Sequence, residues 1–285
     1  MRRSEDVAAW RVAMDRLVAE NDTERLWATD PVWFLHQTAD PAQQELLAFL
    51  ASCLAFGGVA QIKGSIARVL GAAGESLLWD RPEPGRLLPA LAGFKHRWAD
   101  GQDVTVLLNG LLAVRARGGL EAAFLEGVRP GDEDYLEALT AFRNLLLRLG
   151  REGHPVGTLR PGAGDCLLPD LAKGGACKRL HLALRWLVRK DQVDLGLWRG
   201  LDKARLLMPV DVHVHRICTR LGFCKRSAAD LKASREITAN FRLLDPTDPV
   251  KYDFAITRLG MLGFCGAKPG CDRCPLQGLC GGEPT

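Results

Sequence analysis

Four cysteines crowd into sixteen residues near the end of the chain, where they could hold a metal. Their spacing is C-x5-C-x2-C-x5-C, and they are Cys265, Cys271, Cys274 and Cys280. Thiolates are soft ligands, and the glycines around them let the backbone wrap closely around an ion or cluster. Zinc sites commonly use two separated C-x2-C pairs, whereas here one central pair has longer arms. The spacing favours an iron–sulfur cluster, with structural zinc as the alternative.

A lysine in the first turn of a predicted helix is a second group that could do chemistry. Lys178 follows Lys173, Gly174 and Gly175, and the helix after it has an apolar face. A glycine turn can bring backbone N–H groups close to an anion. The positive end of the helix dipole should lower the pKa of Lys178, and an amine so placed can attack an electrophilic carbon. The alternative is a lysine that contacts phosphate or only solvent.

An aspartate in the segment Pro-Val-Asp-Val-His is the third such group. Asp211 precedes a predicted amphipathic helix, where it can accept hydrogen bonds that keep it ionised. Helix capping alone would also explain it. His213, two residues later, could contact nucleic acid or be an exposed helix residue without a role.

Basic residues are concentrated between Leu171 and Lys190, which carry six of them and no acid. The whole chain has a formal charge of only +4, so the concentration is local. Such a run predicts contacts with a phosphate backbone, for which we single out Lys173, Arg179 and Arg185. Lys268, inside the cysteine loop, would add to them. The alternative for each is a solvated charge.

The elements that must position these groups are predicted to be helices. Apolar residues recur at steps of three and four, and no convincing alternating strand is present. Asp40-Pro41 and Asp248-Pro249 each predict a helix start, and Gly222 and Gly263 predict helix ends. The uncharged stretch 46–62 predicts one buried helix. The expected fold class is all-α.

Composition agrees with a folded protein, since 47% of the residues are hydrophobic and 25% are charged. The stretch 46–62 is too short and too polar for a membrane span, so we expect no membrane association. The first residues lack the apolar segment of a secretory signal, which predicts a cytoplasmic protein, and disulfides are then improbable.

Taken together, these features resemble the helix–hairpin–helix DNA glycosylase superfamily. The cysteine loop is similar to that of endonuclease III and its relatives, although its first arm is one residue shorter. The string 209–213 is similar to the corresponding segment of 8-oxoguanine glycosylases, and the 33-residue step from Lys178 to Asp211 resembles their archaeal branch. As a whole the chain looks like a bacterial branch of the superfamily. The resemblance covers 165–280 well and 40–70 weakly.

The resemblance implies a base-excision-repair enzyme that flips a damaged base out of double-stranded DNA, and it favours an oxidised purine as that base. Lys178 matches the lysine that attacks the sugar, Asp211 matches the aspartate that stabilises charge on it, and the cysteines match the ligands of a [4Fe–4S] cluster. It also implies a monomer associated with the nucleoid, DNA contacts from the residues named above, and a wedge near 56–61 that includes Gln61.

Two lobes are expected from this resemblance. The first, residues 27–208, would be a helical barrel with the hairpin, and the second, residues 1–26 plus 209–285, would carry the cluster loop. The hairpin 169–175 is longer than usual and lacks the compact Pro-Gly-x-Gly pattern. A DNA-structure binder without catalysis is therefore the main alternative, and a zinc-stabilised module that binds RNA or protein is a third.

Overall fold

The computed structural model describes residues 4–21, 24–79, 84–265 and 270–280. The chain is mostly helical, in agreement with the all-α prediction. Within these ranges the strands are β1 (Lys95–His96) and β2 (Ala99–Asp100), which form a two-stranded antiparallel hairpin.

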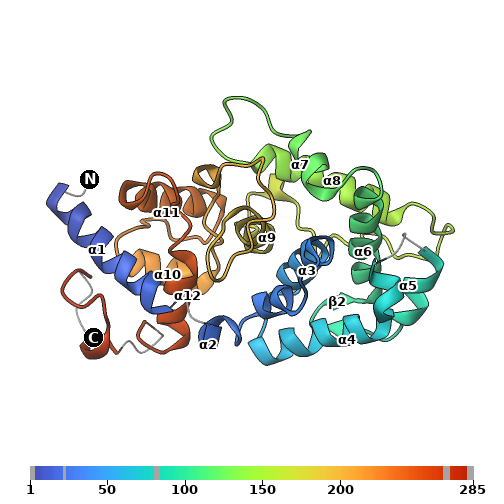
Figure 1. Ribbon diagram of the computed structural model, residues 1–285, viewed down its shortest axis with the longest axis horizontal. Coiled ribbons are helices and arrows are strands. Elements are labelled where there is room, and N and C mark those ends of the chain that lie inside the picture. Colours follow the sequence, from blue (N-terminus) through green and yellow to red (C-terminus); the bar gives the residue numbers. More distant parts are fainter. Residues whose placement is uncertain (1–3, 22–23, 80–83, 266–269, 281–285) are drawn as a thin grey trace.

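The helices fall into two groups (Figure 1). One group contains α2 (Glu24–Trp27), η1 (Pro31–Gln37), α3 (Pro41–Cys53), α4 (Val59–Trp79), α5 (Pro84–Ala90), α6 (Gly101–Arg115), α7 (Leu120–Leu125) and α8 (Leu136–Arg151). The other contains α1 (Ser4–Asn21), α10 (Val212–Arg220), α11 (Leu231–Leu244), α12 (Asp253–Met261) and η4 (Cys271–Arg273). Between them lie η2 (Leu171–Lys173), α9 (Lys178–Val188) and η3 (Lys203–Arg205).

Each group has its own hydrophobic core. The first core runs from Val32 to Leu206 and adds Val250 and Phe254 from α12 and the turn before it. Its helices α6 and α8 pack backbone to backbone, because a Cβ on Gly150 would lie 2.0 Å from the Val106 carbonyl oxygen. Only glycine allows so close an approach.

The second core joins α1 to the helices that follow residue 208. It contains a series of aromatic contacts, in which the ring centroids of Phe223 and Phe241 are 4.6 Å apart and those of Phe241 and Tyr252 are 5.1 Å apart. Trp10 of α1 packs edge-on against Phe223. The first residues described therefore pack with the last ones, and the two ends of the chain lie on the same side of the molecule in Figure 1.

Several predicted helix boundaries are confirmed. Asp40 caps α3 by accepting the Ala42 N–H, and Gly222 and Gly263 follow α10 and α12 with φ of 72° and 80°. A left-handed residue just after a helix is the usual way in which its last carbonyls are satisfied.

Two boundary predictions are wrong. The stretch 46–62 is not one helix, because α3 ends at Cys53 and the chain turns at Gly57, with φ of 106°, before α4 begins at Val59. Asp248-Pro249 does not begin a helix either, since it lies in a turn and α12 begins at Asp253. The Asp248 carboxylate instead bonds to buried Arg189.

Helix α9 is the structural link between the groups. It packs along α3, and Figure 1 shows it between α3 and the helices α10 and α11. Among the described helices, none is long and apolar enough to cross a membrane.

Candidate active site

A large cleft opens between the two groups of helices. It has a volume of about 1090 Å³, and its walls come from the loop between α3 and α4, from η2 and the start of α9, and from the first turns of α10 and α12. Small-molecule pockets are usually about 300–1,000 Å³, so a nucleoside-sized group fits within it.

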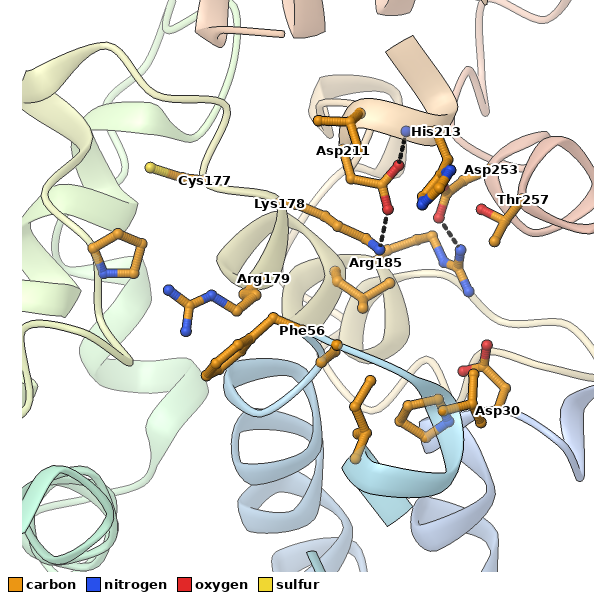
Figure 2. A pocket seen from close by; sticks show the side chains of 18 of the residues that line it. Asp30, Phe56, Cys177, Lys178, Arg179, Arg185, Asp211, His213, Asp253 and Thr257 are labelled. Atoms are coloured by element: carbon orange, nitrogen blue, oxygen red, sulfur yellow. Dashed lines mark hydrogen bonds and ion pairs between the residues drawn. The ribbon is translucent and has the colours of Figure 1, made fainter. Parts of the chain in front are cut away.

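Lys178 and Asp211 meet in this cleft, as Figure 2 shows. The Lys178 Nζ atom donates to Asp211 Oδ2 at 2.7 Å, although 33 residues separate the two along the chain. Their side chains are 25% and 26% exposed, so the pair is open to the cleft. The sequence placed each at the start of a helix, and the structure brings these two helix starts together.

Asp211 is the N-cap of α10, as predicted. Its Oδ1 atom accepts the backbone N–H groups of His213 and Val214, which leaves Oδ2 for Lys178. One carboxylate therefore caps α10 and pairs with Lys178 at the same time. Burial alone would raise the pKa of Asp211, but the Lys178 charge and these hydrogen bonds outweigh it and lower that pKa.

The prediction that helix α9 lowers the pKa of Lys178 is wrong. Burial favours the neutral amine, but the Asp211 carboxylate and its hydrogen bond have the larger combined effect and raise the pKa of Lys178. An opposite charge in contact outweighs the partial charge of a helix terminus. Lys178 therefore rests as an ammonium ion, and Asp211 is the acceptor in contact with it.

Cys177 places Lys178 at the start of α9. It is the N-cap residue and has φ of 43° and ψ of 38°, a left-handed conformation that is rare for a residue other than glycine. Such strained residues cluster at functional sites. The turn directs Lys178 toward Asp211 (Figure 2).

Arg179, which the sequence predicts to contact DNA, lines the cleft and donates to protein atoms. Its Nη1 and Nη2 atoms donate to the carbonyl oxygens of Cys53 and Cys166, and its guanidinium lies 4.8 Å from the ring centroid of Phe56. These bonds join α9 to the end of α3 and to the turn before the hairpin. Arg179 therefore orders the cleft wall that carries Phe56.

Arg185 is also misassigned by the sequence prediction. Its side chain is 3% exposed and donates to Asp194 and to Asp253, so it cannot grip a phosphate backbone at the surface. It lies two turns after Lys178 on the same face of α9, where the chain is buried. The basic run 171–190 is therefore not a continuous surface patch, because Arg185 is buried and paired with Asp194 and Asp253.

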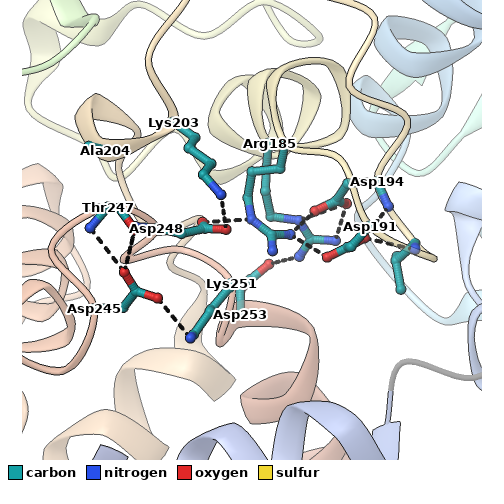
Figure 3. A network of polar contacts seen from close by, with 12 residues as sticks. Arg185, Asp191, Asp194, Lys203, Ala204, Asp245, Thr247, Asp248, Lys251 and Asp253 are labelled. Carbon is teal, nitrogen blue, oxygen red and sulfur yellow. Dashed lines mark hydrogen bonds and ion pairs between the residues drawn. The ribbon is translucent and has the colours of Figure 1, made fainter.

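Arg185 belongs to a larger group that we call the buried arginine network (Figure 3). Its members are Arg185, Arg189, Asp191, Asp194, Asp248 and Asp253, with Lys203 at its edge. Burial disfavours the arginine charges, but the surrounding carboxylates outweigh it and raise the pKa values of Arg185 and Arg189. The network fastens α9 to the turn before α12 and to the first turn of α12.

Asp253 is a cleft residue that the sequence analysis missed. One of its carboxylate oxygens accepts from Arg185, while the other is buried without a partner among the described residues. Burial raises the pKa of Asp253, although Arg185 and Lys178 oppose this effect. The sequence does contain a signal for this residue, since Asp253 is an acid inside the apolar run 252–256. A charge at such a position needs a buried partner.

Most of the other residues that the sequence predicts to contact DNA line the cleft. They are exposed there, and they are Lys173 and Gly175 of the hairpin and His213 of α10. Gly174 is not among them, and its N–H closes the η2 turn on Leu171 while its carbonyl accepts from Leu231. The Gly174 N–H is therefore used inside the protein and does not offer itself to an anion.

Gln61 is exposed in the first turn of α4 but does not line the cleft. Its neighbours Phe56, Gly57 and Gly58 do, so the loop before α4 forms this wall. Lys268 lies outside the described residues.

The four cysteines of the C-terminal loop are free thiols. Cys265 belongs to the second core, and Cys274 and Cys280 pack against it. Cys265 is fixed to α12 through its N–H bond to Leu259, and the Cys274 N–H bonds to the Cys271 carbonyl, which closes the C-x2-C turn. Burial raises the pKa of Cys274, and so do the neighbouring thiols of the other three cysteines. Deprotonating one thiol is thus disfavoured by the others, which is the situation that a bound cation relieves.

The donor set of this loop therefore fits a thiolate-bound metal centre. Within the part of the chain that the structure describes, no three His, Cys, Asp or Glu side chains are already gathered into a ligand set. The fit lies in the type of donor and in the turn that carries it.

Comparison with known proteins places the chain in a family and gives no activity. No curated protein matches it. One family model matches residues 30–262, a range that includes the cleft, Lys178, Asp211 and the buried arginine network. Since that range is most of the chain, the protein belongs to the family described as Protein of unknown function (DUF2400).

Proposed function

We propose that this protein is a DNA N-glycosylase with an associated lyase activity, and that it removes a damaged base that has been flipped into the cleft. The observation that carries the proposal is the 2.7 Å contact between Lys178 and Asp211 inside that cleft. An amine beside a carboxylate is the pair that a nucleophilic substitution at a sugar carbon needs, because the reaction develops positive charge on the sugar.

The reaction begins when Lys178 gives a proton to solvent, to which the ion pair is partly exposed, so that Asp211 keeps its charge. The Lys178 nitrogen lone pair then attacks C1′ of the deoxyribose. The C1′–N bond breaks, and its electron pair leaves with the base, which takes up a proton. The Asp211 carboxylate stabilises the positive sugar electrostatically. Ring opening gives a Schiff base between Nζ and C1′, and loss of a C2′ proton then expels the 3′ phosphate by β-elimination.

Extruding a base costs a few kcal/mol, and phosphate contacts must offset this. In the proposed complex Lys173 and His213 at the cleft rim contribute phosphate contacts, since both are exposed there, whereas Arg179 and Arg185 hold the walls in place.

The proposed fold is the two-lobed helix–hairpin–helix glycosylase fold. The two hydrophobic cores support it, because Leu206 is the last residue of the 27–208 segment in the first core and Met208 already belongs to the second.

A [4Fe–4S] cluster bound by Cys265, Cys271, Cys274 and Cys280 belongs to the same proposal. When bound, it would order the loop beside the second core. The free thiols and the closed turn at Cys271 support this assignment.

The test is a panel of duplexes, each with one lesion, assayed for base release and for strand nicking. Excision of at least one base, lost in Lys178→Ala and strongly reduced in Asp211→Asn, is the expected result. An 8-oxoguanine duplex is the first to try, with the undamaged duplex as the control. Excision that is unchanged in both variants would refute the assignment of the site.

A DNA-structure binder without catalysis is the second candidate. The observation that favours it is the Lys178–Asp211 ion pair, because the adjacent carboxylate raises the pKa of Lys178 and so disfavours the neutral amine that attack on carbon requires. This candidate predicts salt-dependent binding to abasic or bulged DNA that Asp211→Asn does not change, with no product from any lesion.

A further inference from the structure

An exposed tryptophan stands at the tip of the β1–β2 hairpin. The Trp98 side chain is 56% exposed. Every other aromatic side chain that the structure describes is buried or half-buried. A single exposed apolar side chain is ordinary on a protein surface, so the meaning of this ring depends on what surrounds it. The reaction proposed above makes no use of it.

The hairpin holds Trp98 in a fixed position. His96 is fully buried, and its two ring nitrogens contact the Ser65 hydroxyl at 2.9 Å and the Phe56 carbonyl at 3.0 Å. Arg68 donates to the Lys95 carbonyl at 2.8 Å, and Asp100 caps α6. Both strands are therefore bonded to helices of the first core, and these bonds fix the position of the tip between them.

The two tip residues have an unusual turn. The register pairs His96 with Ala99, which leaves Arg97 and Trp98 as a two-residue turn, and Arg97 has φ of 54°. Glycine is the usual residue at the first position of such a turn, so an arginine there is strained. The turn also carries a cation beside the ring, since the Arg97 guanidinium lies 4.8 Å from the Trp98 ring centroid.

The tip lies at the rim of the cleft. Arg97 is one of the cleft walls, and the Trp98 ring is stacked on Phe56, another wall, with centroids 4.9 Å apart and planes 19° apart. Phe56 is in turn covered by Arg179, which adjoins Lys178 in sequence and at the cleft (Figure 2). Aromatic rings alternating with arginines thus lead from the surface to the catalytic pair.

We propose that the Arg97–Trp98 tip binds the DNA duplex at the place where the target nucleotide has been extruded, with Trp98 stacking on the unpaired base of the opposite strand. The inference rests on the proposed function, which requires an extruded nucleotide. Base stacking on an exposed aromatic ring is tolerant of sequence, and an adjacent arginine supplies a phosphate contact. The neighbouring exposed cations, Lys95 and Arg68, suit a nucleic acid better than an apolar protein surface.

The test uses a duplex with a tetrahydrofuran abasic analogue opposite 2-aminopurine, whose fluorescence falls when it stacks. Lys178 cannot act on this analogue because its C1′ carries no leaving group, so binding is measured alone. Wild-type protein should quench the fluorescence. Trp98→Ala should lose the quenching and bind about tenfold more weakly, and Trp98→Phe should retain part of both.

Matched controls separate this role from general electrostatics and from folding. Arg97→Ala should weaken binding, whereas Arg117→Ala, at an exposed arginine paired with Glu152, should not. Thermal unfolding of Trp98→Ala should match the wild type, because the ring is largely outside the core.

The inference would be overturned if Trp98→Ala bound DNA with wild-type affinity and quenching. It would also be overturned if Trp98→Ala changed the oligomeric state and left DNA binding unchanged, because the tip would then be an interface between copies of the chain. Excision on lesion duplexes is scored separately. Excision without an effect of Trp98 would leave the proposed function standing, whereas Trp98-dependent binding without excision would refute that function alone.

Discussion

Helix α9 carries two sets of ion pairs that differ in a single physical respect. Near its start, Lys178 pairs with Asp211, and both side chains are about one quarter exposed. Two turns later Arg185 pairs with Asp194 and Asp253, and all three are 4% exposed or less. The first pair is open to the cleft, whereas the second is enclosed by its own partners. In the proposed mechanism burial therefore separates the pair that does chemistry from the pair that holds the fold.

The largest expected difference is in catalysis. Lys178→Ala should reduce excision by about 10⁴-fold, because it removes the nucleophile, while the free energy of unfolding changes by less than about 1 kcal/mol, since the pair is partly exposed. Initial rates on a lesion duplex and denaturant unfolding measure both. Lys190→Ala, at an exposed lysine just beyond the same helix, is the control and should leave both unchanged.

The next effect is the reverse pattern at Arg185. Arg185→Met should lower the free energy of unfolding by about 3–5 kcal/mol, because Asp194 and Asp253 would remain buried without their partner. Equilibrium unfolding in urea measures it, and Arg117→Ala is the control at an exposed arginine. A change of less than 1 kcal/mol would mean that the buried arginine network does not hold α9 in place.

A smaller effect is expected from Asp211→Asn, which keeps the shape of the cap. Excision should fall by about 10²–10³-fold through lost electrostatic stabilisation. Removing the carboxylate also removes the charge that raises the pKa of Lys178, so the amine becomes neutral at lower pH.

Schiff-base formation on preformed abasic DNA, measured against pH, tests this second effect. Its alkaline rise should begin at a lower pH in Asp211→Asn than in the wild type. An unchanged or upward shift would contradict the account of this ion pair.

The smallest effect on the cleft is expected from the C-terminal loop. Cys274→Ser should lose bound iron and sulfide, while Cys177→Ser should retain both, because Cys177 lies at α9, away from the loop. Metal and sulfide analysis of the two purified variants decides this. Zinc without sulfide in the wild type would refute the cluster and would leave the Lys178–Asp211 pair unaffected.

The sequence predicts features that depend on neighbouring residues better than features that depend on distant ones. The capping role of Asp211 and the position of Lys178 at a helix start depend on neighbouring residues, and both are confirmed. The contact between them follows from packing of two helices, which the residues alone do not specify. The sequence reached it only through the resemblance to a family.

Long-range burial accounts for the failures. Arg185 looks like its exposed neighbours in the sequence, and the acids that neutralise it lie 9 and 68 residues away. The pKa of Lys178 moved opposite to the prediction for the same reason, because its strongest partner is distant in sequence. Trp98 received no role, since a two-residue turn that leaves one ring exposed has no periodic signal.

Borohydride trapping followed by peptide mapping tests the central claim most directly. Wild-type protein reduced in the presence of its lesion duplex should form a covalent adduct, and the modified peptide should carry the sugar on Lys178. An adduct on another residue, or one that forms equally well in Lys178→Ala, would contradict the claim that Lys178 and Asp211 act together on one deoxyribose.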